Sequence, residues 1–147
     1  MTISAIESAI VTRLQDKCGD LVDRVYTAAE VAQLEEQLQL TPSITVMYNG
    51  YRPATDIAGG VIQGVTFSFL VVVAVKNAAG SHRSTGVRGD ASGIVDAVIE
   101  ALVNFRAYEG AGSILRLADA PGASFSDIGF AYYPLQFDIT RTYRGKL

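Results

Sequence analysis

Few side chains in this sequence could carry catalytic or redox chemistry. His82 is the single histidine and Cys18 the single cysteine among 147 residues. A catalytic triad would have to use His82, which lies in the polar run SHRST, and a triad needs a rigid scaffold and a positioned acid. One cysteine excludes an intramolecular disulfide and a CxxC metal or redox pair, and its place after an apolar helix face indicates a structural thiol. We therefore predict no catalytic centre, metal site or cofactor; a small enzyme that uses His82 is the alternative.

Paired carboxylates and glycine-rich stretches give no stronger candidate. Asp96 and Glu100 are four residues apart on the polar side of a predicted helix, where solvated surface charge accounts for them. Ala58-Gly59-Gly60 precedes a strand, and the GxxxxGK[ST] pattern that holds phosphate is absent. Arg88-Gly89-Asp90 spells the integrin-binding tripeptide, but it leads into a strong helix, where an early aspartate favours the helix dipole. A cell-binding module that uses this tripeptide is a minor alternative.

The composition is that of a chain with a large core and a surface poor in charge. Hydrophobic residues make up 49% of the sequence and charged residues 18%, whereas about 25% of a typical soluble domain is charged. The net charge of −3 argues against electrostatically driven binding of nucleic acid. We expect a single domain over residues 1–147. Because no secretory signal or bilayer-spanning run is visible, we also expect folding in the cytoplasm and no membrane partner.

Helical spacing and capping signals predict two helices in the first third of the chain. The first carries apolar residues over 3–14 and is stopped by Gly19 in the left-handed conformation. The second opens with a capping box of Thr27 and Glu30 and ends before Pro42. A short extended piece lies between them.

Alternating apolar residues and turn signals predict the remaining elements. The stretch 51–60 is a loop by composition, and a polar loop over 77–86 leads into the strongest helix, at about 88–106. A change of phase between Tyr132 and Tyr133 indicates a β-bulge in the last strand. The predicted strands are residues 44–48, 61–76, 114–117 and 128–140. This order predicts an α+β fold, a small and mostly antiparallel sheet with helices packed on one face.

The strand 61–76 raises the main question about this fold. Every second residue from Val65 to Val75 is apolar, as expected of a strand with one face on a core. The opposite face begins polar and then becomes apolar at Leu70, Val72 and Ala74. Few elements remain to cover this second face, and an exposed apolar patch of this kind marks a protein interface. We therefore predict that these three residues form a subunit contact.

The ends of the predicted hairpins hold residues suited to docking. The loop 81–88 carries two arginines and the lone histidine, and it is either a solvent loop or a loop that becomes ordered on a partner. The hairpin end near 48–52 carries two tyrosines and an arginine, types enriched at interface hot spots, although a tyrosine at a strand end is also ordinary. The candidate residues for docking on a partner protein are therefore Tyr48, Tyr51, Arg52, His82, Arg83 and Arg88.

The order and texture of these elements resemble a known family over nearly the whole chain. An opening helix (SAIESAIVTRL), a capped second helix (TAAEVAQLEEQLQLTPSITVMYNGY), a long valine-rich strand, a loop into a helix (GIVDAVIEALVNF) and a closing strand (FAYYPLQFDITRTYRG) follow one another. This pattern is similar to the tail terminator, or tail completion, proteins of Mu-like phages and prophages.

The resemblance implies a structural protein of the virion without enzymatic activity. Such proteins form a hexameric ring on the last ring of the tail tube protein, stop tube growth, and present a surface for the neck or head-completion protein. In contractile tails the ring also meets the sheath, and DNA passes through it without specific binding. The low charge and the doubly apolar strand agree with this expectation. Another ring of the tail or neck, such as the tube protein or a head–tail joining protein, is the nearest alternative.

Overall fold

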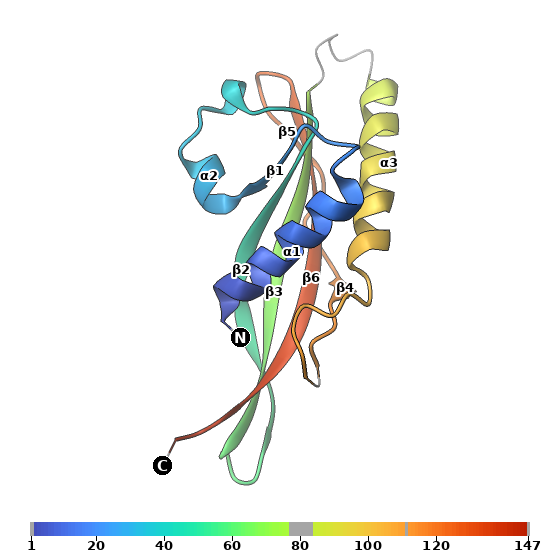
Figure 1. The fold of residues 1–147 in the computed structure, drawn as a ribbon. Helices are drawn as coiled ribbons and strands as arrows, with labels where there is room; N and C mark the ends of the chain where they lie inside the picture. Colours follow the sequence, from blue (N-terminus) through green and yellow to red (C-terminus); the bar gives the residue numbers. More distant parts are fainter. Residues whose placement is uncertain (1, 77–83, 111, 147) are drawn as a thin grey trace.

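The chain forms one mixed sheet with helices around it (Figure 1). The computed structural model describes residues 2–76, 84–110 and 112–146, with the backbone alone over 84–90. The elements are α1 (Ile3–Cys18), β1 (Arg24–Thr27), α2 (Ala28–Ala32), the 3-10 helix η1 (Glu36–Leu38), β2 (Ser43–Ile57), β3 (Ile62–Lys76), α3 (Ser84–Leu102), β4 (Arg116–Ala118), β5 (Ser124–Phe125) and β6 (Phe130–Arg144). The predicted α+β class is confirmed.

Three long strands make the centre of the sheet. The strand order is β1-β2-β3-β6-β4, and β5 also pairs with β6. The pairing of β1 with β2 is parallel, and the other pairings among the described strands are antiparallel. The register of β3 on β6 is unbroken from Ile62 opposite Arg144 to Lys76 opposite Phe130. The predicted sheet of mostly antiparallel strands is therefore confirmed.

The helices α1 and α3 pack on the same face of this sheet (Figure 1). In α1 the residues at helical spacing, Ile6, Ile10 and Leu14, are fully buried. They join Val71 and Val73 of β3 in one core cluster, to which α3 also contributes. The alternation of β3 places its odd-numbered residues on this face, as the sequence predicted.

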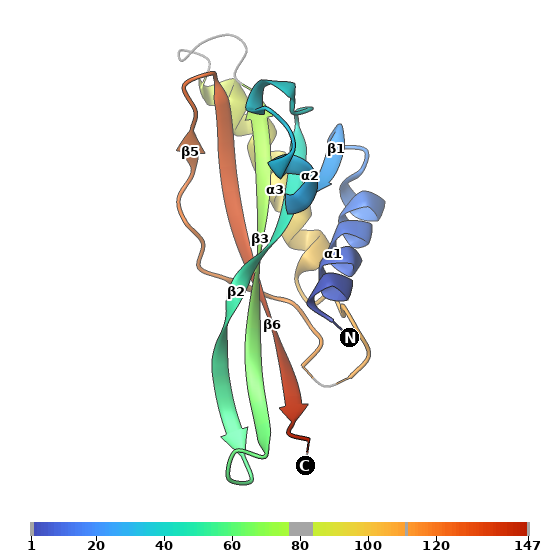
Figure 2. The same cartoon turned by 90° about the vertical axis from the view of Figure 1, so that its left-hand side faces the viewer.

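The connection between β1 and β2 lies on the opposite face of the sheet. We call residues 28–42, which contain α2 and η1, the crossover. The hydroxyl of Tyr132 in β6 donates a hydrogen bond to Glu36, and the backbone N–H of Leu40 donates to the hydroxyl of Tyr26 at 3.1 Å. Figure 2 shows the crossover in front of the upper sheet and α3 behind it. Helices on one face alone were therefore an incomplete prediction, because the crossover covers part of the other face.

The predicted caps and ends of the first two helices are confirmed only in part. The N-cap of α1 is Thr2, and Gly19 is right-handed at φ −59°, so its predicted left-handed stop is wrong. A side chain at Gly19 would meet the carbonyl oxygen of Gln15 at 2.4 Å, which accounts for a glycine there. The capping box of Thr27 and Glu30 is confirmed. The helix that it opens ends at Ala32, well before the predicted end.

We expect the Glu30→Gln variant to have a lower melting temperature than wild type at neutral pH, but not in acid. The carboxylate of Glu30 accepts hydrogen bonds from the Arg24 guanidinium and from the Thr27 N–H, and these lower its pKa. A lowered folded-state pKa stabilises the fold above the ordinary pKa of 4.5, and this contribution is lost as the pH falls through the folded-state value. Thermal unfolding from pH 7 to 3 should show the two melting temperatures converging in acid. A constant difference across this range would contradict the assignment.

Two predictions about the long strands were wrong. The expected loop over 51–60 is largely strand, because β2 pairs with β3 as far as Ile57 and absorbs its turn-forming residues in two register shifts. The expected bulge at Tyr132 and Tyr133 does not occur. Apolar residues appear on both faces of β6 there because the crossover covers one face and the helix layer the other.

The far end of the three long strands extends beyond the helices. We call residues 51–67 and 139–146 the arm. Figures 1 and 2 show it reaching past α1, with the β2–β3 turn at its tip and the end of β6 beside it. β1 pairs with β2 only as far as Val46, and β4 with β6 only as far as Asp138. Among the described strands, both edges of the arm therefore lack a neighbour.

Candidate assembly surfaces

The second face of β3 is partly covered by the crossover and partly open. Ala74 is 2% exposed. It pairs with Ser43 of β2 and with Tyr132 of β6, and Tyr132 is the residue that contacts the crossover. Leu70 and Val72 are half-buried. We call these two residues the open strip. Ala74 offers almost no surface to another chain, whereas the subunit contact at the open strip stays a prediction.

A buried carboxylate organises the polar end of the same face. Asp138 has an 11% exposed side chain and accepts hydrogen bonds from Ser68 at 2.7 Å, Gln136 at 3.2 Å and Arg52 at 2.8 Å. Thr66 and Thr140 bond each other nearby at 3.0 Å. Arg52, predicted to dock on a partner, thus takes part in an internal ion pair that joins β2 to β6. Its side chain is still 60% exposed, so its docking role stays a prediction.

We expect Asp138→Asn to lower the free energy of unfolding by about 1–3 kcal/mol, because a charged hydrogen-bond acceptor is lost beneath Arg52. The measurement is denaturant unfolding of folded monomer. Asp119→Asn is the matched control, since Asp119 is exposed in a loop. Equal stability of the two variants would show that the network contributes nothing beyond surface charge.

The predicted docking tyrosines lie on the helix-side face, where the arm begins. Tyr48 is opposite Phe69 and Tyr51 opposite Phe67, so one extra residue of β2 is accommodated between the two pairs. This bulge is why tyrosines three residues apart share one face. Ring centroids are 5.7 Å apart for Tyr48 and Phe69 and 6.4 Å for Tyr51 and Phe67. Both tyrosines are exposed, with Tyr51 at 67%.

A third exposed aromatic residue at this surface was not among the residues predicted from the sequence. Tyr143 of β6 meets the ring of Phe67 edge-on at 6.2 Å, and the guanidinium of Arg141 lies 4.9 Å above the ring of Tyr143. Both are odd-numbered residues of β6, on the same face as Phe67, whose partner is Ile139. The position of Tyr143 beside Phe67 follows from the pairing register of β3 with β6. Alternation within the tail TRTYRGKL could have indicated it.

The other docking candidates fall at or beyond the limits of the described chain. His82 and Arg83 lie outside the described residues. Arg88 lies in α3, which begins at Ser84, so the predicted loop 81–88 is wrong for its second half. The side chain of Arg88 is not among those described.

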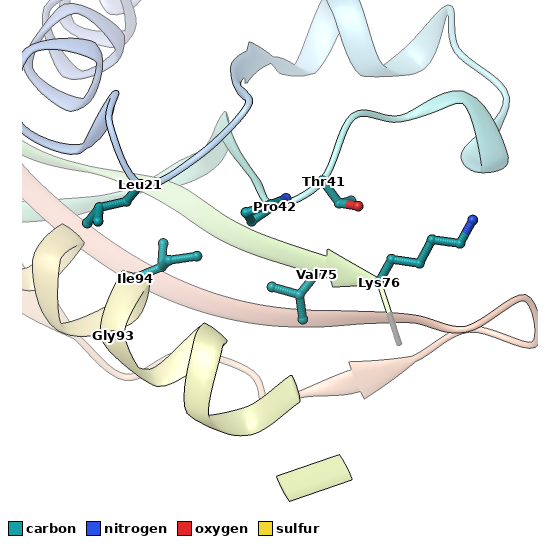
Figure 3. Close-up of a pocket in the computed structure, with 7 residues that line it drawn as sticks. All are labelled: Leu21, Thr41, Pro42, Val75, Lys76, Gly93 and Ile94. Atoms are coloured by element: carbon teal, nitrogen blue, oxygen red, sulfur yellow. The ribbon is translucent and has the colours of Figure 1, made fainter. Parts of the chain in front are cut away.

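The described residues hold no arrangement suited to catalysis. No group of three or more potential metal ligands occurs among them. Burial raises the pKa of the Cys18 thiol, which disfavours a reactive thiolate. A pocket of about 390 Å³ lies between the crossover, the end of β3 and α3 (Figure 3). Its lining has no carboxylate, histidine or cysteine, and consists of Leu21, Thr41, Pro42, Val75, Lys76, Gly93 and Ile94. None of the described helices is long and apolar enough to cross a membrane.

Comparison with protein families shows to which family the chain belongs. The family model described as phage tail terminator protein matches residues 3–145. The chain belongs to the phage tail terminator family. A search of the curated proteins found no match. Membership of this family makes the protein a structural component of the phage tail that caps the tail tube. The prediction that it is no enzyme is confirmed.

The terminator carries opposite charges in the crossover and at the end of the arm. The crossover has three acidic residues and no basic one, and the arm segment 139–146 has three basic residues and no acidic one. Figures 1 and 2 show these two segments toward opposite ends of the long strands. The residues are Glu30, Glu35 and Glu36 in the crossover and Arg141, Arg144 and Lys146 in the arm.

Proposed function

We propose that six copies of this terminator close into a ring on the end of the tail tube. The terminator ring ends tube growth because it covers the surface on which the next ring of tube protein would assemble. The outer surface of the terminator ring then binds the neck or head-completion protein. Each subunit contributes residues 1–147 as a single domain. DNA passes through the ring without specific binding, and in a contractile tail of the Mu-like type the ring also meets the sheath.

The open strip is the observation that best supports the proposed ring. Leu70 and Val72 are apolar, half-buried and placed in the middle of a sheet face. On one side Ala74 is covered, opposite the tyrosine that meets the crossover, and on the other side polar side chains begin at Ser68. An apolar strip with a polar border is typical of the centre of a subunit contact. Closed cyclic symmetry is the usual outcome when one surface of a subunit meets a different surface of the next.

The exposed tyrosines support a contact with another chain of the assembled tail. Tyr48 and Tyr51 are held by packing against buried phenylalanines, so little conformational freedom would be lost on binding. Tyrosine in such a setting is a frequent hot-spot residue.

The test is the absolute mass of the purified protein by light scattering, followed by negative-stain imaging of the same peak. Discrete rings of six subunits are expected, and adding the protein to growing tail tubes should fix their length. Long filaments of this chain alone would identify a tube protein instead. A monomer that also fails to bind purified tube ends would overturn the proposed ring.

A further inference from the structure

Two exposed patches of this chain complement each other but cannot meet within one subunit. The arm patch consists of Tyr51, Arg141 and Tyr143 on the helix-side face, together with Arg144, the next residue of β6, whose side chain alternates to the other face. Arg141 is half-buried and the other three are exposed, so the end of the arm combines aromatic surface with positive charge. The crossover patch consists of Glu35, Leu38 and Leu40, and it combines apolar surface with negative charge. Leu38 is 62% exposed and Leu40 52%. Figures 1 and 2 show the crossover beside the upper sheet and the arm at its far end.

We propose that the arm patch of one subunit lies on the crossover patch of the next, and that this head-to-tail contact joins the subunits of the ring. The inference rests on the proposed function and names the surfaces that build the ring. Because each subunit offers one patch of each kind, the contact is heterologous, and it closes into a ring when the rotation between neighbours divides a full turn.

The charges of both patches are available for a contact between subunits. Among the described residues, Arg141, Arg144 and Glu35 take part in no ion pair. The basic side chains of the arm would face an acidic segment without a single basic residue. Complementary potentials of this kind orient partners and suppress wrong pairings. A second copy of the chain therefore fits the patch by chemistry that the chain itself carries.

The crossover lies on the same face of the sheet as the open strip. Glu36 of the crossover accepts the hydrogen bond of Tyr132, and Tyr132 pairs with Ala74, two residues along β3 from Val72. An arm lying on the crossover would extend over Val72 and Leu70 as well. The apolar strip and the charged patches would then belong to one interface, with exposed leucines and tyrosines at its centre.

The test exchanges the charges of the two patches. The arm variant is Arg141→Glu with Arg144→Glu. The crossover variant is Glu35→Lys with Gln37→Lys, which leaves the bond between Glu36 and Tyr132 in place. In each variant alone like charges face each other, so the concentration needed for half-assembly should rise at least about a hundredfold. In an equal mixture each variant meets its complement on both sides, and rings of alternating composition should return.

A control for the arm variant keeps the same charge change but moves it elsewhere on the surface. Lys17→Glu with Arg116→Glu reverses two exposed charges outside both patches, and wild-type rings are expected. Circular dichroism and thermal unfolding of the separate variants check that each subunit is folded. Light scattering and negative-stain imaging report the assemblies, both in solution and on purified tail tubes.

The possible outcomes separate this inference from the proposed ring. Rings formed by either single variant, or a mixture that stays monomeric, would overturn the arm-to-crossover contact while wild-type rings leave the proposed function intact. Rings of the arm variant that no longer end tube growth would assign the arm to the tube and overturn the contact between subunits. Absence of wild-type rings in solution and on tubes would overturn both proposals.

Discussion

Replacing Val72 by aspartate is expected to turn the proposed ring into folded monomers. Val72 is half-buried on the face opposite α1 and α3, so water still reaches the new carboxylate in a free subunit. In the ring the same carboxylate would be covered by a neighbour and left without a partner, at a cost of several kcal/mol. Subunit affinity should therefore fall by at least about a hundredfold. Light scattering measures the loss of the ring, and circular dichroism shows that the monomer is folded.

The adjacent residue gives the matched control. Val73 is fully buried against the helices, and Val73→Asp places the same charge on the other face of the same strand. This variant should fail to fold, because an unpaired carboxylate cannot be accommodated in the core. If Val72→Asp also unfolds, the open strip is ordinary core and the subunit contact at Leu70 and Val72 is wrong. If Val72→Asp keeps its rings, the contact lies elsewhere on the surface.

The core side of the fold was largely predictable from the sequence. Helical spacing over 3–14 and alternation along β3 each depend on residues that are close in the chain, and both identified the buried faces. The capping box of Thr27 and Glu30 is equally local. The end of α2 was not predictable in this way, because the crossover breaks after Ala32 to run over the sheet, where Glu36 meets Tyr132.

The surfaces depend on pairings that local patterns do not contain. The loop expected over 51–60 is strand because β3 provides a partner along its length, so tertiary pairing overrides turn composition. The cover on Ala74 comes from a segment over thirty residues away in sequence. Tyr143 joins Phe67 only through the register of two strands separated by α3. Residue type alone therefore made Tyr48 and Tyr51 docking candidates, a role that stays a prediction, but it indicated neither their neighbours nor the internal bond of Arg52.

Among truncations to alanine, the largest effect on the stability of the subunit is expected from Phe69→Ala. Phe69 is fully buried in β3, between Tyr48 of β2 and Phe137 of β6, and it belongs to the core cluster under the helices. Truncating a buried phenylalanine leaves a cavity that close-packed neighbours cannot fill, at a cost of about 3–5 kcal/mol. Against a total stability of about 5–15 kcal/mol, this change leaves the fold marginal.

Phe125 allows the same substitution to be made outside the core. It is 67% exposed and meets Tyr133 edge-on at 6.4 Å, so Phe125→Ala should cost no more than about 1.5 kcal/mol. Free energies of unfolding in urea, measured on monomers of both variants, make the comparison independent of assembly, because mass action would otherwise add ring stability to the wild type. A Phe69→Ala loss no larger than that of Phe125→Ala would contradict the central place of β3 in the core. The difference between the two variants measures how much more a phenylalanine contributes in the core beneath the helices than at the exposed strand β5.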